Sequence, residues 1–124
     1  MIEFEIEELL NEQFFDQIDD ECSSYIMEMN GSELGSYYDI DVDFARSGGI
    51  DNIVLSDYKS VIIQGQNEIT GSAFVYMEAE GYTHFSGEDI YIGEETIKLE
   101  IEFIFYMVGN KSEEFSITNI TQTL

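Results

Sequence analysis

Three aspartates near the middle of the sequence have the residue type and spacing of the first ligands in a calcium-binding loop. Asp39, Asp41 and Asp43 alternate with apolar residues. A calcium loop of this kind also needs glycine at its sixth position and glutamate at its twelfth, and the sixth residue here is Phe44. The alternation instead predicts a β-strand with carboxylates on its exposed face, so we expect no metal site here.

The single histidine and the single cysteine are the other residues with catalytic chemistry. His84 lies among acidic residues, but a zinc site needs three or four donors and the sequence places no second histidine or cysteine nearby. Cys22 falls on the apolar side of a predicted helix, where Asp19, Asp20 and Glu21 would raise the pKa of its thiol. We therefore expect His84 to be a residue of a loop without catalytic chemistry and Cys22 to be a buried, inert thiol.

Carboxylates are so abundant that no pair of them stands out as a hydrolytic site. The 124 residues include 27 Asp and Glu against 4 Lys and Arg, giving a formal net charge of −23. Gly48-Gly49 is not followed by the lysine of a phosphate-binding loop. We expect no catalytic residues and no cofactor, and the charge argues against direct binding to nucleic acid or to anionic membranes. Solubility alone requires a net charge of only about 2–8 in magnitude.

The N-terminal quarter of the chain has the periodicity of an amphipathic helix. We predict one helix from about residue 5 to the Asn30-Gly31 stop, with these residues on its apolar side: Ile6, Leu10, Phe14, Ile18, Cys22, Tyr25 and Met29. The opposite side carries an unbroken series of acids: Glu5, Glu8, Glu12, Asp16 and Asp19, with Asp20 beside them. Like charges at these spacings destabilise a helix by roughly 0.2–0.5 kcal/mol per pair, and no Lys or Arg precedes Arg46. This one-signed surface is our principal candidate for a binding site.

The strongest strand signal lies at residues 96–108. One side alternates through Ile97, Leu99, Ile101, Phe103, Phe105 and Met107. The other side begins with Lys98, Glu100 and Glu102 and ends with apolar residues: Ile104, Tyr106 and Val108. We therefore expect a central strand with a helix or a loop covering that apolar end.

Further strands are predicted at residues 37–44, 53–55, 61–63, 69–80 and 115–120. Ser47-Gly48-Gly49 should interrupt the sheet, residues 81–93 should form a loop with a small ribbon at Ile90–Ile92, and hairpin turns should lie at residues 64–67 and 109–112. Residues 1–124 then make a single α+β domain. We expect an N-terminal amphipathic helix packed on an antiparallel sheet of about five strands.

The density of charge suggests a function. Ten carboxylates lie between Glu3 and Glu28, which on a helix is about one negative charge per 4 Å, close to the one per roughly 3.4 Å of a DNA strand. This charge pattern resembles that of DNA-mimic proteins, such as phage inhibitors of restriction or CRISPR nucleases. The resemblance implies a non-enzymatic inhibitor that occupies the cationic cleft of a basic, nucleic-acid-binding protein.

The expected contact residues are the helix acids (Glu5, Glu8, Glu12, Asp16, Asp19 and Asp20) and the strand Asp39, Asp41 and Asp43, with Tyr37 and Tyr38 as aromatic anchors. Two other functions fit the same sequence. One is an immunity protein or antitoxin that neutralises a basic toxin. The other is a small-molecule-binding or enzymatic domain, for which Tyr76, Tyr106 and His84 should converge in an aromatic pocket. The lone cysteine, and the absence from the sequence of an apolar leader or of a run of about 20 apolar residues, favour the cytoplasm.

Overall fold

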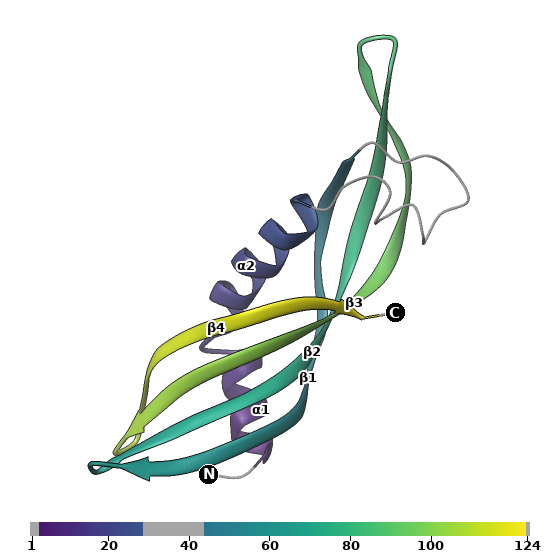
Figure 1. Cartoon of the computed structure of the whole chain (residues 1–124). Helices are drawn as coiled ribbons and strands as arrows, with labels where there is room; N and C mark the ends of the chain where they lie inside the picture. Colours follow the sequence, from purple (N-terminus) through teal and green to yellow (C-terminus); the bar gives the residue numbers. More distant parts are fainter. Residues whose placement is uncertain (1–2, 29–43, 124) are drawn as a thin grey trace.

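The computed structural model describes residues 3–28 and 44–123 (Figure 1). Two helices, α1 (Glu3–Asn11) and α2 (Phe15–Met27), precede four strands, β1 (Phe44–Ile63), β2 (Gln66–Phe85), β3 (Glu88–Val108) and β4 (Lys111–Thr123). The strands form one antiparallel sheet in the order β1-β2-β3-β4. The α+β class is confirmed, with four strands in the described residues where about five were predicted. The predicted strand with Tyr37, Tyr38, Asp39, Asp41 and Asp43 lies outside the described residues.

The single predicted helix is wrong, because the chain turns between α1 and α2. The buried residues of this segment recur every four positions: Ile6, Leu10, Phe14, Ile18, Cys22 and Ile26. Each step of four overshoots a helical turn by about 40°, so a straight helix would rotate the later members away from the sheet. The Phe14 N–H donates to the Leu9 carbonyl at 2.9 Å, five residues back. This wider turn restores the phase, and α2 continues with its apolar side facing the core.

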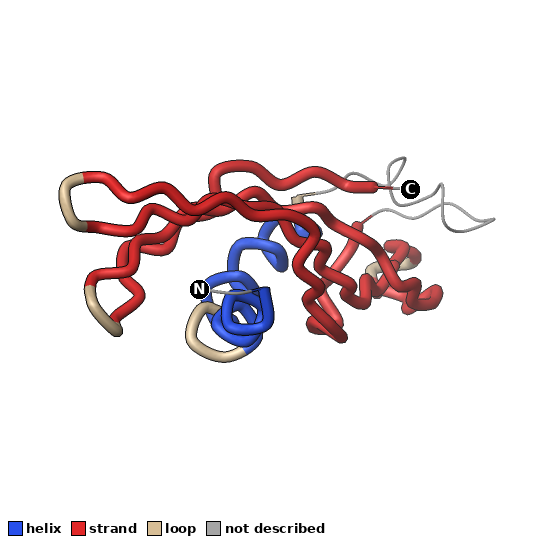
Figure 2. Tube along the Cα trace, turned by 90° about the horizontal axis from the view of Figure 1, so that it is seen from below, coloured by secondary structure: helices blue, strands red, loops and turns tan. Residues whose placement is uncertain are grey.

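Both helices pack on one face of the sheet (Figure 2). The predicted alternation of β3 is confirmed, since Ile97, Leu99, Ile101, Phe103 and Phe105 are buried against that helical layer. β3 lies between β2 and β4, as expected of a central strand. The expected cover over Ile104, Tyr106 and Val108 is not provided by either described helix, because these residues belong to the opposite, open face. Ile104 and Tyr106 are half-buried, and Val108 is exposed.

The strands are longer than the sequence pattern indicates. β1 runs without interruption through Ser47-Gly48-Gly49 and through both short strands predicted near its end. Its register shifts at three places, Ser47/Gly49, Ile50/Asn52 and Leu55/Asp57. Each shift reverses the alternation of side chains, which explains why one strand has the sequence pattern of several fragments. Likewise, residues 81–93 are not a loop: β2 and β3 continue as a hairpin to a tight turn before Glu88, at the far end of the molecule in Figure 1.

Polar side chains of the helices bind the backbone of both outer strands. On β1, the Leu55 N–H donates to the Glu7 carboxylate at 3.1 Å, and Asn11 donates to the Ile53 carbonyl at 3.1 Å. On β4, Gln13 donates to the Ser112 carbonyl at 3.2 Å. These contacts place the helical layer across the sheet and occupy backbone groups that an outer strand otherwise exposes.

Candidate protein-binding surface

Four carboxylates form a row on the outer side of the helical layer. They recur every four residues, two positions after the first four buried residues of the segment, and all are exposed: Glu8, Glu12, Asp16 and Asp20, called here the acidic row. Two positions correspond to about 200° of helical rotation, so the acidic row lies opposite the core. The turn that keeps the apolar residues on the sheet also keeps these acids in register with one another.

The remaining predicted helix acids are less uniform. Glu5 is exposed, next to the start of the row. Asp19 is half-buried, and its carboxylate accepts a hydrogen bond from the Ser23 hydroxyl at 3.3 Å, so it is less available to a partner. Glu7 was not among the predicted contact residues, and its carboxylate accepts a hydrogen bond from the backbone of β1. Neighbouring acids on one helix therefore have different roles, and only the exposed ones contribute to a binding surface.

No base neutralises the helix carboxylates in the described part of the chain. All four Lys and Arg residues follow residue 44, on the strands. The two ion pairs found among the described residues both involve Asp89, which lies 4.0 Å from Arg46 and 3.1 Å from His84. Lys98 instead lies over the Phe74 ring, 4.0 Å from its centroid, on the open face of the sheet. The negative field of the helical layer is consequently uncompensated within that layer.

Two hollows lie beside the acids of α1, between the helix and the turns at one end of the sheet. One has a volume of about 330 Å³ and is lined by Glu5, Glu8 and Glu12 together with Leu9 and Met107. The other, of about 360 Å³, shares Glu5 and Met107 and extends to Ile62 and the β1–β2 turn. Apolar surface therefore adjoins the acids, which suits a cationic side chain with an aliphatic stem.

Apolar side chains at this end of the sheet, not among the contact residues predicted from the sequence, are exposed. Ile62 is 78% exposed, Ile63 is 48% exposed and Val108 is 40% exposed. We call these three residues the apolar tips. The sequence does contain a signal for this exposed apolar surface: the run Val61-Ile62-Ile63 directly precedes the Gln64-Gly65 turn. No second layer covers the tip of a hairpin, so a continuous apolar run there must be partly exposed. Exposed apolar groups beside a charged surface are typical of protein interfaces.

Cys22, Tyr76 and His84, three residues considered for chemistry from the sequence, do not meet in one site. Cys22 is buried, as predicted, and burial raises the pKa of its thiol to about 12, with Glu21 and Asp19 adding to the effect. Tyr76 and His84 are eight residues apart on the same strand, or roughly 26 Å, so they cannot converge in one pocket. His84 belongs to a strand rather than a loop, and its ring lies 3.1 Å from Asp89. No group of three potential metal ligands occurs among residues 3–28 and 44–123.

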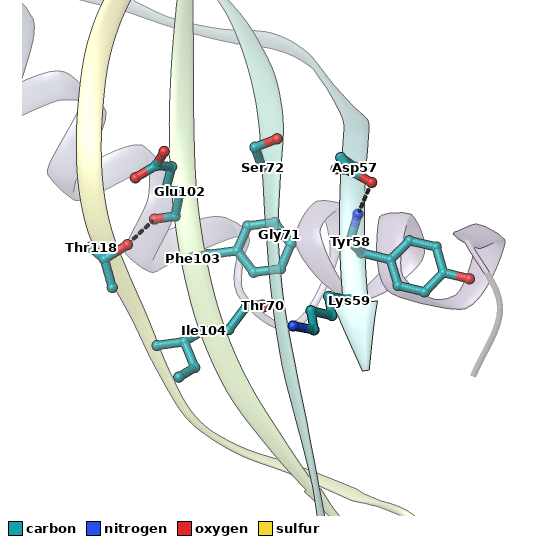
Figure 3. A pocket seen from close by; sticks show the side chains of 10 residues that line it. All are labelled: Asp57, Tyr58, Lys59, Thr70, Gly71, Ser72, Glu102, Phe103, Ile104 and Thr118. Atoms are coloured by element: carbon teal, nitrogen blue, oxygen red, sulfur yellow. Dashed lines mark hydrogen bonds between the residues drawn. The ribbon is translucent and has the colours of Figure 1, made fainter. Parts of the chain in front are cut away.

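The open face carries a further shallow hollow of about 360 Å³ (Figure 3). Asp57, Ser72 and Glu102 lie side by side on β1, β2 and β3 and line it from the same face. The two carboxylates are separated by an intervening strand, or about 10 Å between backbones. Neither histidine nor cysteine lines this hollow. It is a shallow depression with a mixed polar and apolar lining.

Three comparisons with known proteins supply no relative. No family model, no curated protein and no solved structure matches the chain.

Neither described helix is long and apolar enough to cross a membrane. The candidate function therefore depends on the acidic row and its surroundings.

Proposed function

We propose that the protein is a non-enzymatic, acidic inhibitor that occupies the cationic cleft of a basic, nucleic-acid-processing protein in the cytoplasm. The observation that carries the proposal is the acidic row, four exposed carboxylates in register on the outer side of the helical layer. The chain maintains this row although its like charges repel one another, as Asp16 and Asp20 do one turn apart on α2. A surface kept at a cost in stability is explained by a partner that needs it.

Electrostatics supports this choice of partner. A cleft built for a phosphate backbone presents Lys and Arg over a long, narrow surface. Residues 3–28 carry ten carboxylates, seven of them exposed, and no Lys or Arg. Such complementarity speeds association and is weakened by salt, because the Debye length falls from about 10 Å at 0.1 M to about 3 Å at 1 M. The hollows next to Glu5 and Glu8, whose lining includes Leu9, Met107 and Ile62, add packing surface at one end of the row.

The proposal is tested by capture of a partner on the immobilised protein at low and high salt. The variant Glu8→Lys/Glu12→Lys/Asp16→Lys/Asp20→Lys reverses the acidic row. A matched control, Asp51→Lys/Asp57→Lys/Glu88→Lys/Glu95→Lys, changes the net charge equally at exposed positions of the sheet. We expect the native protein and the control to retain a basic nucleic-acid-binding protein at 0.1 M salt, with release at about 1 M and displacement by duplex DNA. We expect the row variant to retain none.

Two results would overturn the proposal: retention that salt and DNA leave unchanged, or equal loss in both variants. Identification of the captured protein also distinguishes an inhibitor of a nucleic-acid-processing protein from the alternative function. A toxin encoded beside this chain would assign the same surface to an immunity protein or antitoxin.

A further inference from the structure

The outer edge of β4 differs from the rest of the molecule in charge. Residues 115–124 contain no Asp, Glu, Lys or Arg, which makes this the longest such stretch in a sequence that is 25% charged. β4 is the last strand of the sheet, so no strand of the described sheet pairs with its other side. Natural outer strands are usually blunted by charges, by proline or by a covering element. Neither a charge nor a proline is present here.

The helical layer covers only the first part of this edge. Gln13 binds the Ser112 carbonyl, and Gln17 donates to the Phe115 carbonyl at 3.1 Å. Beyond Phe115, no helix side chain is hydrogen-bonded to Ser116–Thr121 within the described part of the chain. Ser116, Thr118, Asn119 and Thr121 are exposed. We call residues Ser116–Thr121 the β4 edge.

Carboxylates flank the β4 edge on both faces of the sheet. On the helical side, Glu21 accepts a hydrogen bond from Gln17 at 3.3 Å, next to the bond from Gln17 to β4. On the open side, Glu100 and Glu102 of β3 are the register partners of Thr121 and Asn119. A strand added beside β4 would place its side chains alternately on these two faces, about 10 Å or less from the acids, within reach of Lys and Arg.

We infer that the β4 edge binds an extended segment of the basic partner, which adds to the sheet as a fifth strand through backbone hydrogen bonds. The inference rests on the proposed function for the charge of the partner. Charge complementarity selects this occupant over a second copy of the chain, because pairing two β4 edges would bring together two molecules of net charge −23. The acidic row attracts the partner, and the uncharged edge provides directional bonds that salt does not screen.

The test uses the full chain and a defined probe, a peptide of about eight residues that alternates Lys with Val and Thr. Two control peptides are the same sequence N-methylated at alternate residues and the same sequence with Glu for Lys. The variant Ser116→Lys/Thr121→Lys places charges on the β4 edge. Asn52→Lys/Ser56→Lys adds the same charge at exposed positions of β1, where α1 covers the backbone.

Binding is measured by fluorescence anisotropy, and the site is mapped by amide chemical shifts. We expect the Lys peptide to shift the Ser116–Thr121 amides, and its affinity to fall about tenfold or more with N-methylation or with Ser116→Lys/Thr121→Lys, but not with the β1 variant. No binding, equal binding of the N-methylated peptide, or shifts confined to the helices would overturn the inference. So would a dimer of the free protein that Ser116→Lys/Thr121→Lys dissociates. Each of these results leaves the capture experiment on the acidic row unaffected, so the two proposals fail separately.

Discussion

Glu7 and Leu55 are 48 residues apart, yet the Leu55 backbone N–H donates to the Glu7 carboxylate at 3.1 Å. The bond forms at the Leu55/Asp57 register shift, where β1 departs from regular pairing with β2. A helix side chain therefore satisfies a backbone donor that the sheet does not. Glu7 is half-buried at this contact, whereas the next residue, Glu8, points away from the sheet and is exposed.

This difference predicts opposite outcomes for two adjacent substitutions. Glu7→Ala should lower the free energy of unfolding by about 1–2 kcal/mol, since a charged acceptor is removed and a backbone donor is left unpaired. Glu8→Ala should leave stability unchanged or raise it slightly, because a repulsive charge is lost. Urea unfolding of both variants checks the prediction. Equal effects would contradict the separate roles given to the two carboxylates.

Reversing the charge of an acid in the acidic row should stabilise the protein by an amount that depends on the position of that acid along α2. Asp16 lies in the first turn of α2, where the helix dipole favours a negative charge, whereas Asp20 lies one turn later. Asp20→Lys also creates an i,i+4 pair with Asp16, so we expect it to stabilise the protein by roughly 0.5 kcal/mol. Asp16→Lys should stabilise less, because it loses the favourable dipole interaction.

Thermal unfolding at low salt and at about 1 M salt tests the comparison. The gain from Asp20→Lys should shrink at high salt, because the interactions between exposed charges are then screened. A gain that is independent of salt would indicate a cause other than repulsion.

Glu78 on the open face gives a prediction about pH. The Thr96 hydroxyl donates to Glu78 at 2.9 Å and favours the carboxylate. The neighbouring Asp51 carboxyl, desolvation and the negative charge of Glu94 outweigh this bond and raise the pKa of Glu78. An acid whose pKa is higher in the folded state takes up protons on folding, so its contribution to stability is lost as pH rises from the unfolded pKa through the folded pKa.

Glu78→Gln removes this charge and keeps an oxygen that can accept from Thr96. The variant should therefore melt at a higher temperature than the native protein at pH 7, with a smaller difference near pH 4, the ordinary range of a glutamate. Melting curves across this pH range provide the measurement. A difference in melting temperature that grows toward acid pH would contradict a raised pKa of Glu78.

Cys22 should be unreactive in the folded protein. With a thiol pKa of about 12 in place of 9.0, the thiolate fraction at pH 8 falls by about a thousandfold, and burial blocks access as well. Alkylation by iodoacetamide should be slow in buffer and fast in denaturant. Rapid modification of the folded protein at the rate of a free thiol would place Cys22 outside the core.

Parts of the structure with one regular period were predictable from the sequence. The alternation from Ile97 to Phe105 indicated the central strand because β3 is regular there. The spacing of four in the helical segment predicts a helix, but four is so close to 3.6 residues per turn that the pattern does not locate the turn at Phe14. In β1, three register shifts hid a single strand.

The candidate site was predictable only in part, for a related reason. Charge and spacing identified the exposed acids of α1, whereas the different role of Glu7 depends on a bond to a residue far away in the chain. The apolar tips and the β4 edge are defined by where strands end and what lies beside them. These features depend on which distant segments lie side by side in the folded chain, so a local sequence pattern cannot predict them.

The turn between α1 and α2 amounts to one additional residue in an otherwise helical segment. If the residues between Asn11 and Phe15 continued a regular helix instead, with none removed, the segment would be one continuous rod with its second half rotated by about 100°. Acids would then point toward Phe105 and Phe115, and the cysteine would move toward water. The separation of the apolar side of the helical segment from its charged side thus depends on the geometry of the turn between α1 and α2 as much as on the residues in each helix.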